Sequence, residues 1–152
     1  MSVHYGYAGK VLKIDLCNRK LSEYPWSAQD RENNLGGKIM AAQILQDHLT
    51  GKETAFSDDN WVVITTGPLT GTGAPGSVRF DIATRSPKDD LPAFSNCGGN
   101  LGVYLKKAGS EAIDSGYRNG NGLGEVSSGW ISFFRAGTAN SQENQIKNRL
   151  CH

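Results

Sequence analysis

A glycine-rich loop, an arginine just after it, and an Asn-Cys-Gly-Gly turn form the part of the sequence best suited to binding chemistry. The loop spans residues 67–77 and contains four glycines, Arg79 lies two residues beyond it, and the turn begins at Asn96 and continues through Gly98. Glycine lets a backbone approach a ligand closely, and arginine offers a fixed fork of donors to phosphate groups or to the acceptor edge of a ring. We call residues 67–77 the glycine loop, and its setting predicts a site for a large, planar, anionic ligand.

Each of these residues also has a plain structural interpretation. A strand arginine is commonly a solvated or ion-paired surface residue, and loop glycines commonly serve only the geometry of turns. Gly36 and Gly37 could likewise form a simple turn before a helix. Cys97 has no neighbouring histidine, so a small buried thiol is favoured over a metal ligand or a nucleophile. His48 is interpreted as an exposed residue on a helix.

Several other chemistries have no support in the sequence. Cys17, Cys97 and Cys151 lie far apart, which disfavours a local zinc or iron–sulfur site, and their odd number argues against a disulfide framework. The glycine loop lacks the Gly-Lys-Ser/Thr of a nucleotide-binding P-loop, and neither G-x-S-x-G nor H-E-x-x-H occurs. Nucleotide hydrolysis and simple hydrolase chemistry are therefore disfavoured.

The composition indicates a soluble protein with one ordinary domain. The 152 residues include 16 basic and 15 acidic side chains, a formal net charge of +1, so nucleic-acid binding and a polybasic membrane anchor are not expected. The longest apolar run, residues 61–64, is far shorter than the roughly 20 residues of a membrane helix, and residues 1–9 do not resemble a signal peptide. We expect a cytoplasmic location.

Hydrophobic periodicity predicts an α+β fold with layered mixed or antiparallel sheets and two main helices. Alternating apolar residues predict a hairpin from residues 10–16 and 20–24, and further strands at 61–66 and 78–84 on either side of the glycine loop. Apolar residues at helical spacing predict helices over residues 38–49 and 98–108. Residues 87–92 are typical of an exposed connection.

The segment after Gly109 differs in character from the rest. It is rich in glycine and serine and shows no sustained periodicity, so no structure is predicted over residues 109–129. Residues 130–134 could form a strand, and residues 141–150 a short polar helix. We therefore divide the chain into residues 1–109 and a divergent remainder, residues 110–152.

Ordered motifs make the chain similar to one known family. They are Gly-Tyr-Ala-Gly-Lys-Val-Leu-Lys-Ile-Asp-Leu at 6–16, Leu-Gly-Gly-Lys at 35–38, Thr-Gly-Pro-Leu-Thr-Gly-Thr at 66–72 with Ala-Pro-Gly at 74–76, Arg79 with Thr-Arg-Ser-Pro at 84–87, Ser-Asn-Cys-Gly-Gly at 95–99, and Leu-Lys-Lys-Ala-Gly at 105–109. In order and spacing they resemble the N-terminal domain of the aldehyde ferredoxin oxidoreductase family of tungsten or molybdenum pterin enzymes. The chain departs from that pattern at Ile39, where many relatives have glycine, and after Gly109.

The resemblance implies a cofactor role for residues 1–109. Family members use this domain as a base for a metal bis-pterin cofactor, and later domains supply the cysteines of a four-iron cluster. The whole enzymes oxidise aldehydes to acids and pass electrons to ferredoxin. By resemblance, Arg79, Asn96 and Gly98 contact the pterin, and the Asn96 backbone carbonyl helps to hold a magnesium ion between two pterin phosphates. An arginine fork, an amide that both donates and accepts, and a glycine turn at a helix start fit such a ligand.

Three interpretations follow from the resemblance. The favoured one is a truncated or separately encoded cofactor-binding domain, with the four-iron cluster supplied by protein outside this chain. The second is a non-catalytic assembly module that contacts a cysteine-rich oxidoreductase subunit or ferredoxin. The third is a decayed remnant of the family. Because family domains contain a structural duplication, we expect an exposed sheet edge here and self-association through it. The substrate, the choice of metal and the electron acceptor are left open.

Overall fold

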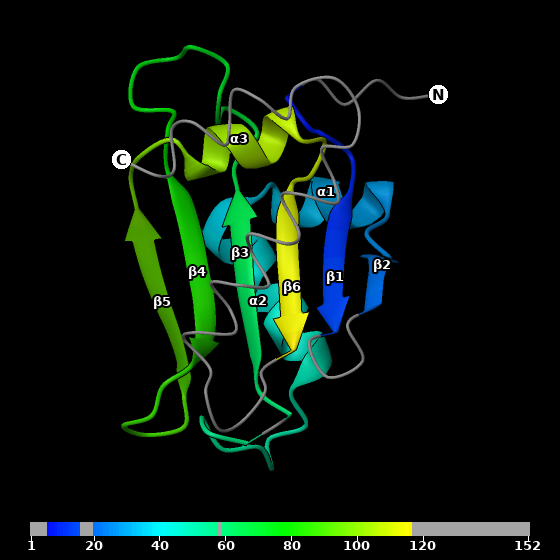
Figure 1. The fold of residues 1–152 in the computed structure, drawn as a ribbon, viewed down its shortest axis with the longest axis vertical. Coiled ribbons are helices and arrows are strands. Elements are labelled where there is room, and N and C mark those ends of the chain that lie inside the picture. Colours follow the sequence, from blue (N-terminus) through cyan, green and yellow to red (C-terminus); the bar gives the residue numbers. More distant parts are fainter. Residues whose placement is uncertain (1–5, 16–19, 58, 117–152) are drawn as a thin grey trace. The chain divides into compact units, whose positions relative to one another are not determined.

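Six strands form one mixed sheet in the order β2-β1-β6-β3-β4-β5 (Figure 1). The computed structural model describes residues 6–15, 20–57 and 59–116, and this count refers to them. The strands are β1 (Val11–Asp15), β2 (Lys20–Tyr24), β3 (Trp61–Thr66), β4 (Phe80–Arg85), β5 (Pro92–Cys97) and β6 (Ala112–Gly116). β1 and β2 form an antiparallel hairpin, and β3, β4 and β5 form an antiparallel meander. β6 joins the two groups, parallel to β1 and antiparallel to β3.

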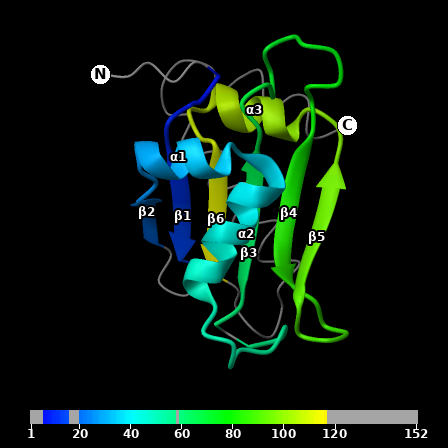
Figure 2. The same cartoon turned by 180° about the vertical axis from the view of Figure 1, so that it is seen from behind.

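Three helices accompany the sheet in the described part of the chain: α1 (Ala28–Asn34), α2 (Gly37–His48) and α3 (Leu101–Lys107). Figures 1 and 2 show α1 and α2 on one face of the sheet, and α3 across the end where the glycine loop emerges. None of the helices in the described residues is long and apolar enough to span a membrane.

The hydrophobic core lies between α2 and the sheet. One face of α2 is buried against residues from four strands, and the innermost side chains are Met40, Ala41, Ile44, Leu45, Val11, Val63, Ala83 and Ala112. Burying one side chain the size of Ile44 or Leu45 contributes about 1.5–3 kcal/mol. This layer fixes α2, and with it the position of the first turn of α2 beside the glycine loop.

The α+β class and the mixed sheet are confirmed, but three elements differ from the predictions. α1 was not predicted, although Ser27 and Asp30 carry the signature of a capping box, in which each side chain bonds the other's backbone. β5 occupies residues that follow directly on the predicted exposed connection. The expectation that no regular structure follows Gly109 is wrong for β6, an inner strand of the sheet. The strand predicted at 130–134 and the helix at 141–150 lie outside the described residues.

The interpretation of His48 as an exposed residue is wrong. Its side chain is only 12% exposed, and its Nε2 atom lies 2.6 Å from Oδ2 of the fully buried Asp114 in β6. The imidazole also stacks on Trp61, with the two ring centroids 4.0 Å apart. His48 therefore joins the last turn of α2 to the centre of the sheet.

Glu53, in the connection between α2 and β3, is expected to titrate far below an ordinary glutamate. The side chain and the backbone N–H of Thr50 both donate to its carboxylate, at 2.6 and 3.0 Å, and the N–H of Gly51 donates to its other oxygen at 3.0 Å. These bonds, first among them the one from the Thr50 hydroxyl, lower the pKa of Glu53 to about 2. Because the folded pKa is depressed, this contribution to stability is complete above the unfolded pKa of about 4.3 and is lost as the pH falls toward 2.

The measurement is an NMR titration of the Glu53 side-chain carboxyl, whose midpoint we expect near pH 2. Thr50→Ala removes the hydroxyl donor, so the midpoint should move upward. A midpoint near 4.3 in the unaltered protein would contradict the prediction.

Candidate cofactor-binding site

Thr70 holds the two ends of the glycine loop together. Its side-chain oxygen accepts a hydrogen bond from the N–H of Gly67, at 3.1 Å, and donates to the backbone carbonyl of Arg79, also at 3.1 Å. Thr70 is only 6% exposed, so these bonds are largely shielded from water. The position of the Arg79 backbone therefore follows from the way in which the loop closes.

Gly36 lets the start of α2 approach the loop closely. A Cβ atom at this position would lie 2.8 Å from the carbonyl oxygen of Thr66 and 3.1 Å from the Cα atom of Gly67. Gly36 also has a φ of +141°, a conformation that other residues rarely adopt. The glycine is thus more than part of a simple turn, because any side chain here would push α2 away from the glycine loop.

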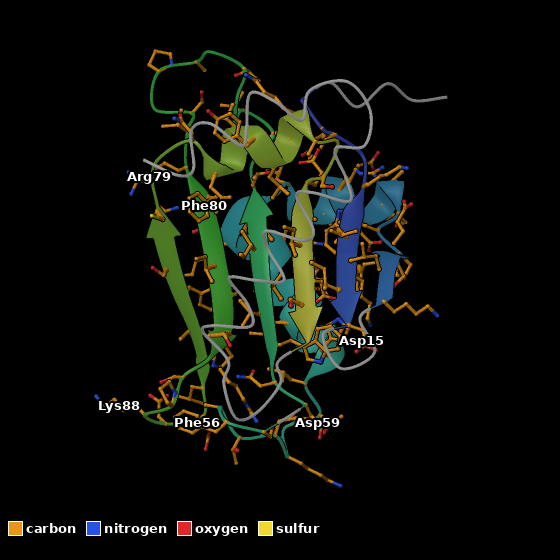
Figure 3. The ribbon with its side chains drawn as sticks, viewed as in Figure 1. Asp15, Phe56, Asp59, Arg79, Phe80 and Lys88 are labelled. Atoms are coloured by element: carbon orange, nitrogen blue, oxygen red, sulfur yellow. The ribbon has the colours of Figure 1, made fainter. Side chains whose placement is uncertain are left out.

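Arg79 and Asn96, which the resemblance assigns to cofactor binding, lie side by side. Figure 3 shows Arg79 at the end of the sheet where the glycine loop meets β4. Its Nε atom donates to Oδ1 of Asn96 in β5. Within the described residues no partner is found for its terminal nitrogens Nη1 and Nη2, and the residue is exposed. The arrangement leaves one side of the guanidinium available to an anion.

Asp81, which the sequence analysis missed, is the third member of this group. The β4–β5 register places it opposite Asn96, whose Nδ2 atom donates to Oδ1 of Asp81 at 3.0 Å. A strand aspartate looks like an ordinary surface residue, but Asp81 lies two positions beyond Arg79. Residues two apart on a strand share a face, and this signal could have identified it.

Gly98 borders open space, as a ligand-contacting glycine must. A Cβ atom at Gly98 or at Gly99 would meet nothing within 4 Å. The expected helix start at these glycines is wrong, however, because α3 begins only at Leu101, has seven residues and lacks a side-chain cap at Asn100. Any contact from Gly98 would therefore come from the turn itself and not from a helix N-terminus.

The described residues hold no local cage for a metal ion. No group of three or more His, Cys, Asp or Glu side chains in them is arranged to coordinate one. Cys97 is exposed and free, so the interpretation of it as a buried thiol is wrong. Its Sγ atom lies 3.5 Å from the carbonyl oxygen of Gly98. What this site can offer a ligand is a cationic fork and open backbone.

A buried ion pair supports the glycine loop from the side of α3. Nζ of Lys106 donates to the backbone carbonyls of Gly6 and Pro68, the second at 3.2 Å, and lies 3.6 Å from Oε2 of Glu111. Burial lowers the pKa of Lys106, and the Glu111 carboxylate acts in the opposite direction. The Glu111 carboxylate is also bonded by the N–H groups of Ala8 and Gly9, the second at 3.3 Å. The pair joins the segment before β1, the glycine loop and α3.

Comparison with known proteins identifies the family. Residues 11–114 match the model of the aldehyde ferredoxin oxidoreductase N-terminal domain, which includes all six strands of the sheet except the last residues of β6. The chain belongs to the aldehyde ferredoxin oxidoreductase family. The matched region contains Arg79, Asp81, Asn96 and Gly98.

Individual relatives agree with this assignment. The chain is 35% identical over 109 residues to the tungsten-containing aldehyde ferredoxin oxidoreductase of Pyrococcus abyssi, a match covering 72% of this chain and 18% of the relative. It is 33% identical over 112 residues to the WOR-like subunit of an aliphatic sulfonate oxidoreductase from Pyrococcus furiosus, with the same coverage. Among solved structures, the BamBC active-site complex of benzoyl coenzyme A reductase superimposes with a TM-score of 0.72 and 34% identity, covering 76% of this chain and 18% of that one. The chain thus spans about a fifth of the length of these relatives.

Proposed function

We propose that this domain is the base of a tungsten or molybdenum pterin site in an oxidoreductase of the aldehyde ferredoxin oxidoreductase family. The observation that carries the proposal is the Arg79–Asn96 pair, with the terminal nitrogens of Arg79 open beside Gly98 at the end of the sheet. Relatives named as tungsten-containing enzymes make a metal–pterin cofactor the ligand to test first.

The residues present fit such a group. Arg79 would donate to the anionic or ring-edge acceptors of a pterin, and the open space at Gly98 would accept its bulk. The side chain of Asn96 is bonded within the protein, so its part toward the ligand falls to its backbone carbonyl, which would help to hold a magnesium ion. When bound, the metal–pterin group supplies the redox chemistry, and the residues of this chain bind and orient it.

The names of the relatives support a role in holding the cofactor over a role in choosing the substrate. They refer to aldehydes, to aliphatic sulfonates and to a coenzyme A thioester, although all share this domain. We infer that the substrate pocket and a four-iron cluster belong to other parts of the complete assembly. Aldehyde oxidation with electron transfer to ferredoxin, like the cytoplasmic location, stays a prediction for that assembly.

A role in assembly is the second candidate, and the outer strand β5 favours it. β5 is at the edge of the sheet, and Ser95, Asn96 and Cys97 on it are exposed. An exposed edge can pair with a strand of another chain. Such pairing would join this domain to an oxidoreductase subunit or to a second copy of itself, and size-exclusion chromatography over a range of concentrations tests the second case.

Metal content tests the cofactor proposal. The protein, purified from a host that makes the tungsten or molybdenum pterin cofactor, should contain one of these metals by elemental analysis, together with pterin. Arg79→Ala removes a charge-assisted hydrogen-bond donor worth about 1.5–3 kcal/mol, so at limiting cofactor the retained metal should fall about tenfold or more.

Lys88→Ala is the matched control. Lys88 is an exposed cation at the opposite end of the sheet (Figure 3), so its loss should leave the metal content unchanged. A metal-free wild-type protein would overturn the proposed function. Equal retention by Arg79→Ala and Lys88→Ala would overturn only the role given to Arg79.

A further inference from the structure

We propose that Asp81 is a positioning residue of this site: it sets the side-chain amide of Asn96 and, through that amide, the orientation of the Arg79 guanidinium. The inference rests on the proposed function for its effect on cofactor binding. The arrangement itself is a property of the ligand-free chain and can be tested separately.

The first step is the choice between the two orientations of the Asn96 amide. An ionised carboxylate can only accept hydrogen bonds, so Oδ1 of Asp81 requires the NH₂ group of Asn96, which lies 3.0 Å from it. That group also lies 3.4 Å from the backbone carbonyl of Phe80, a second acceptor. The amide oxygen must then face the other way, where it accepts from Nε of Arg79. In the flipped orientation two donors would face each other, and the bond to Arg79 would be lost.

The start of α2 holds Asp81 in place. Its Oδ2 atom lies 3.1 Å from where a Cβ atom of Gly37 would be, so the carboxylate fits against this residue only because it is glycine. Gly37 has a φ of +57°, and its carbonyl oxygen accepts a hydrogen bond of 2.9 Å from the hydroxyl of Thr65. The first turn of α2 contains no acidic residue and its N-cap has no side-chain bond, so a nearby carboxylate is favoured there.

The consequence for Arg79 is a fixed fork with an undiminished charge. Its Nε atom is occupied by Asn96, which leaves Nη1 and Nη2 as the pair directed outward. No ion pair between Arg79 and Asp81 occurs in the part of the chain that the structure describes, because the amide lies between them. Ordering one long side chain before binding improves affinity by about two- to tenfold.

The sign of the effect separates positioning from simple electrostatics. Asp81→Ala removes a negative charge from the vicinity of an anionic ligand, so a purely electrostatic role predicts more retained cofactor. A positioning role predicts less, by about two- to tenfold. Asp81→Asn should recover the wild-type level, because its side-chain oxygen can still accept from Asn96. Retention by Asp81→Ala at or above the wild-type level would overturn the proposal.

The dependence on Asn96 provides a second criterion. If Asp81 acts through the amide, adding Asp81→Ala to Asn96→Ala should cause no further loss of metal. A further loss as large as that of the single variant would show that Asp81 acts independently, against the proposal. Asp59→Ala, which removes an exposed carboxylate at the other end of the sheet (Figure 3), is the matched control and should change nothing.

Nitrogen-15 NMR of the ligand-free protein distinguishes failure of this proposal from failure of the proposed function. In the wild-type protein the Asn96 NH₂ and the Arg79 Nε–H should exchange slowly with water, and Asp81→Ala should accelerate both. Acceleration at Asn96 alone, or at neither group, overturns the positioning role whether or not the protein carries metal. Wild-type protein without metal but with the coupled exchange would overturn the cofactor function and leave the positioning intact.

Discussion

Replacing Glu111 with alanine is expected to lower the free energy of unfolding by about 3–5 kcal/mol. The residue is 2% exposed, and its carboxylate bonds the backbone before β1, lies 3.4 Å from the Thr66 hydroxyl and pairs with Lys106. Its removal leaves the Lys106 ammonium buried without its counter-charge. Such a loss is a large part of the 5–15 kcal/mol that usually stabilises a domain. Urea denaturation followed by tryptophan fluorescence provides the measurement.

The matched control is Glu23→Ala, which removes an exposed glutamate from the edge strand β2. A change within about 0.5 kcal/mol is expected there. Glu111→Gln keeps the shape and loses the charge, so its stability should fall between those of the wild type and the alanine variant. If Glu111→Ala were as stable as Glu23→Ala, the ion pair would not hold the glycine loop in the way described.

Replacing His48 with alanine should also cost about 3–5 kcal/mol at neutral pH, because it leaves a buried carboxylate without a partner. Oδ2 of Asp114 is bonded by His48, and Oδ1 has no hydrogen-bond partner in the structure. Burial raises the pKa of Asp114, and His48 acts against that rise. Without His48 the folded pKa should therefore move further above its unfolded value of about 3.9.

The sign of the pH dependence follows from that shift. When the folded pKa of an acid exceeds the unfolded one, the folded state binds more protons, so stability falls as the pH rises through the interval between the two values. The deficit of His48→Ala relative to wild type should accordingly be larger at pH 7 than at pH 4. Adding Asp114→Ala should recover part of the loss at pH 7. Gln46→Ala, an exposed change on the same helix, is the control, and an equal deficit at both pH values would contradict the prediction.

Local patterns predicted the strands well, and non-local pairing accounts for what they missed. β2 and β3 have the predicted bounds because their apolar and β-branched residues are contiguous. α1 buries no residue, so it has no apolar stripe and only its cap marks it. β6 looks like the start of a polar segment because Asp114 interrupts its apolar residues. Its burial depends on His48, 66 positions earlier, which no local pattern contains.

The candidate site shows the same division. The sequence suggested Arg79 and Asn96 through a resemblance, and the structure brings them into contact. It could not suggest Asp81 in the same way, because an aspartate on a strand is usually solvated. Its partner becomes evident only when the β4–β5 register places it opposite Asn96. The contact of Asp81 with Gly37 depends further on where the core seats α2.

The place of β6 in the sheet bears on how the chain can acquire its structure during synthesis. The β1–β2 hairpin and the β3–β5 meander are made first, but no strand pairing connects them until Ala112–Gly116 enters between β1 and β3. Pairing of Val11 with Ala112 closes almost the whole described chain, and contacts so distant in sequence are slow to form. A nascent chain must therefore carry two separate half-sheets with unpaired edges until its last strand leaves the ribosome, and it is in that interval that aggregation or capture by a chaperone would act on it.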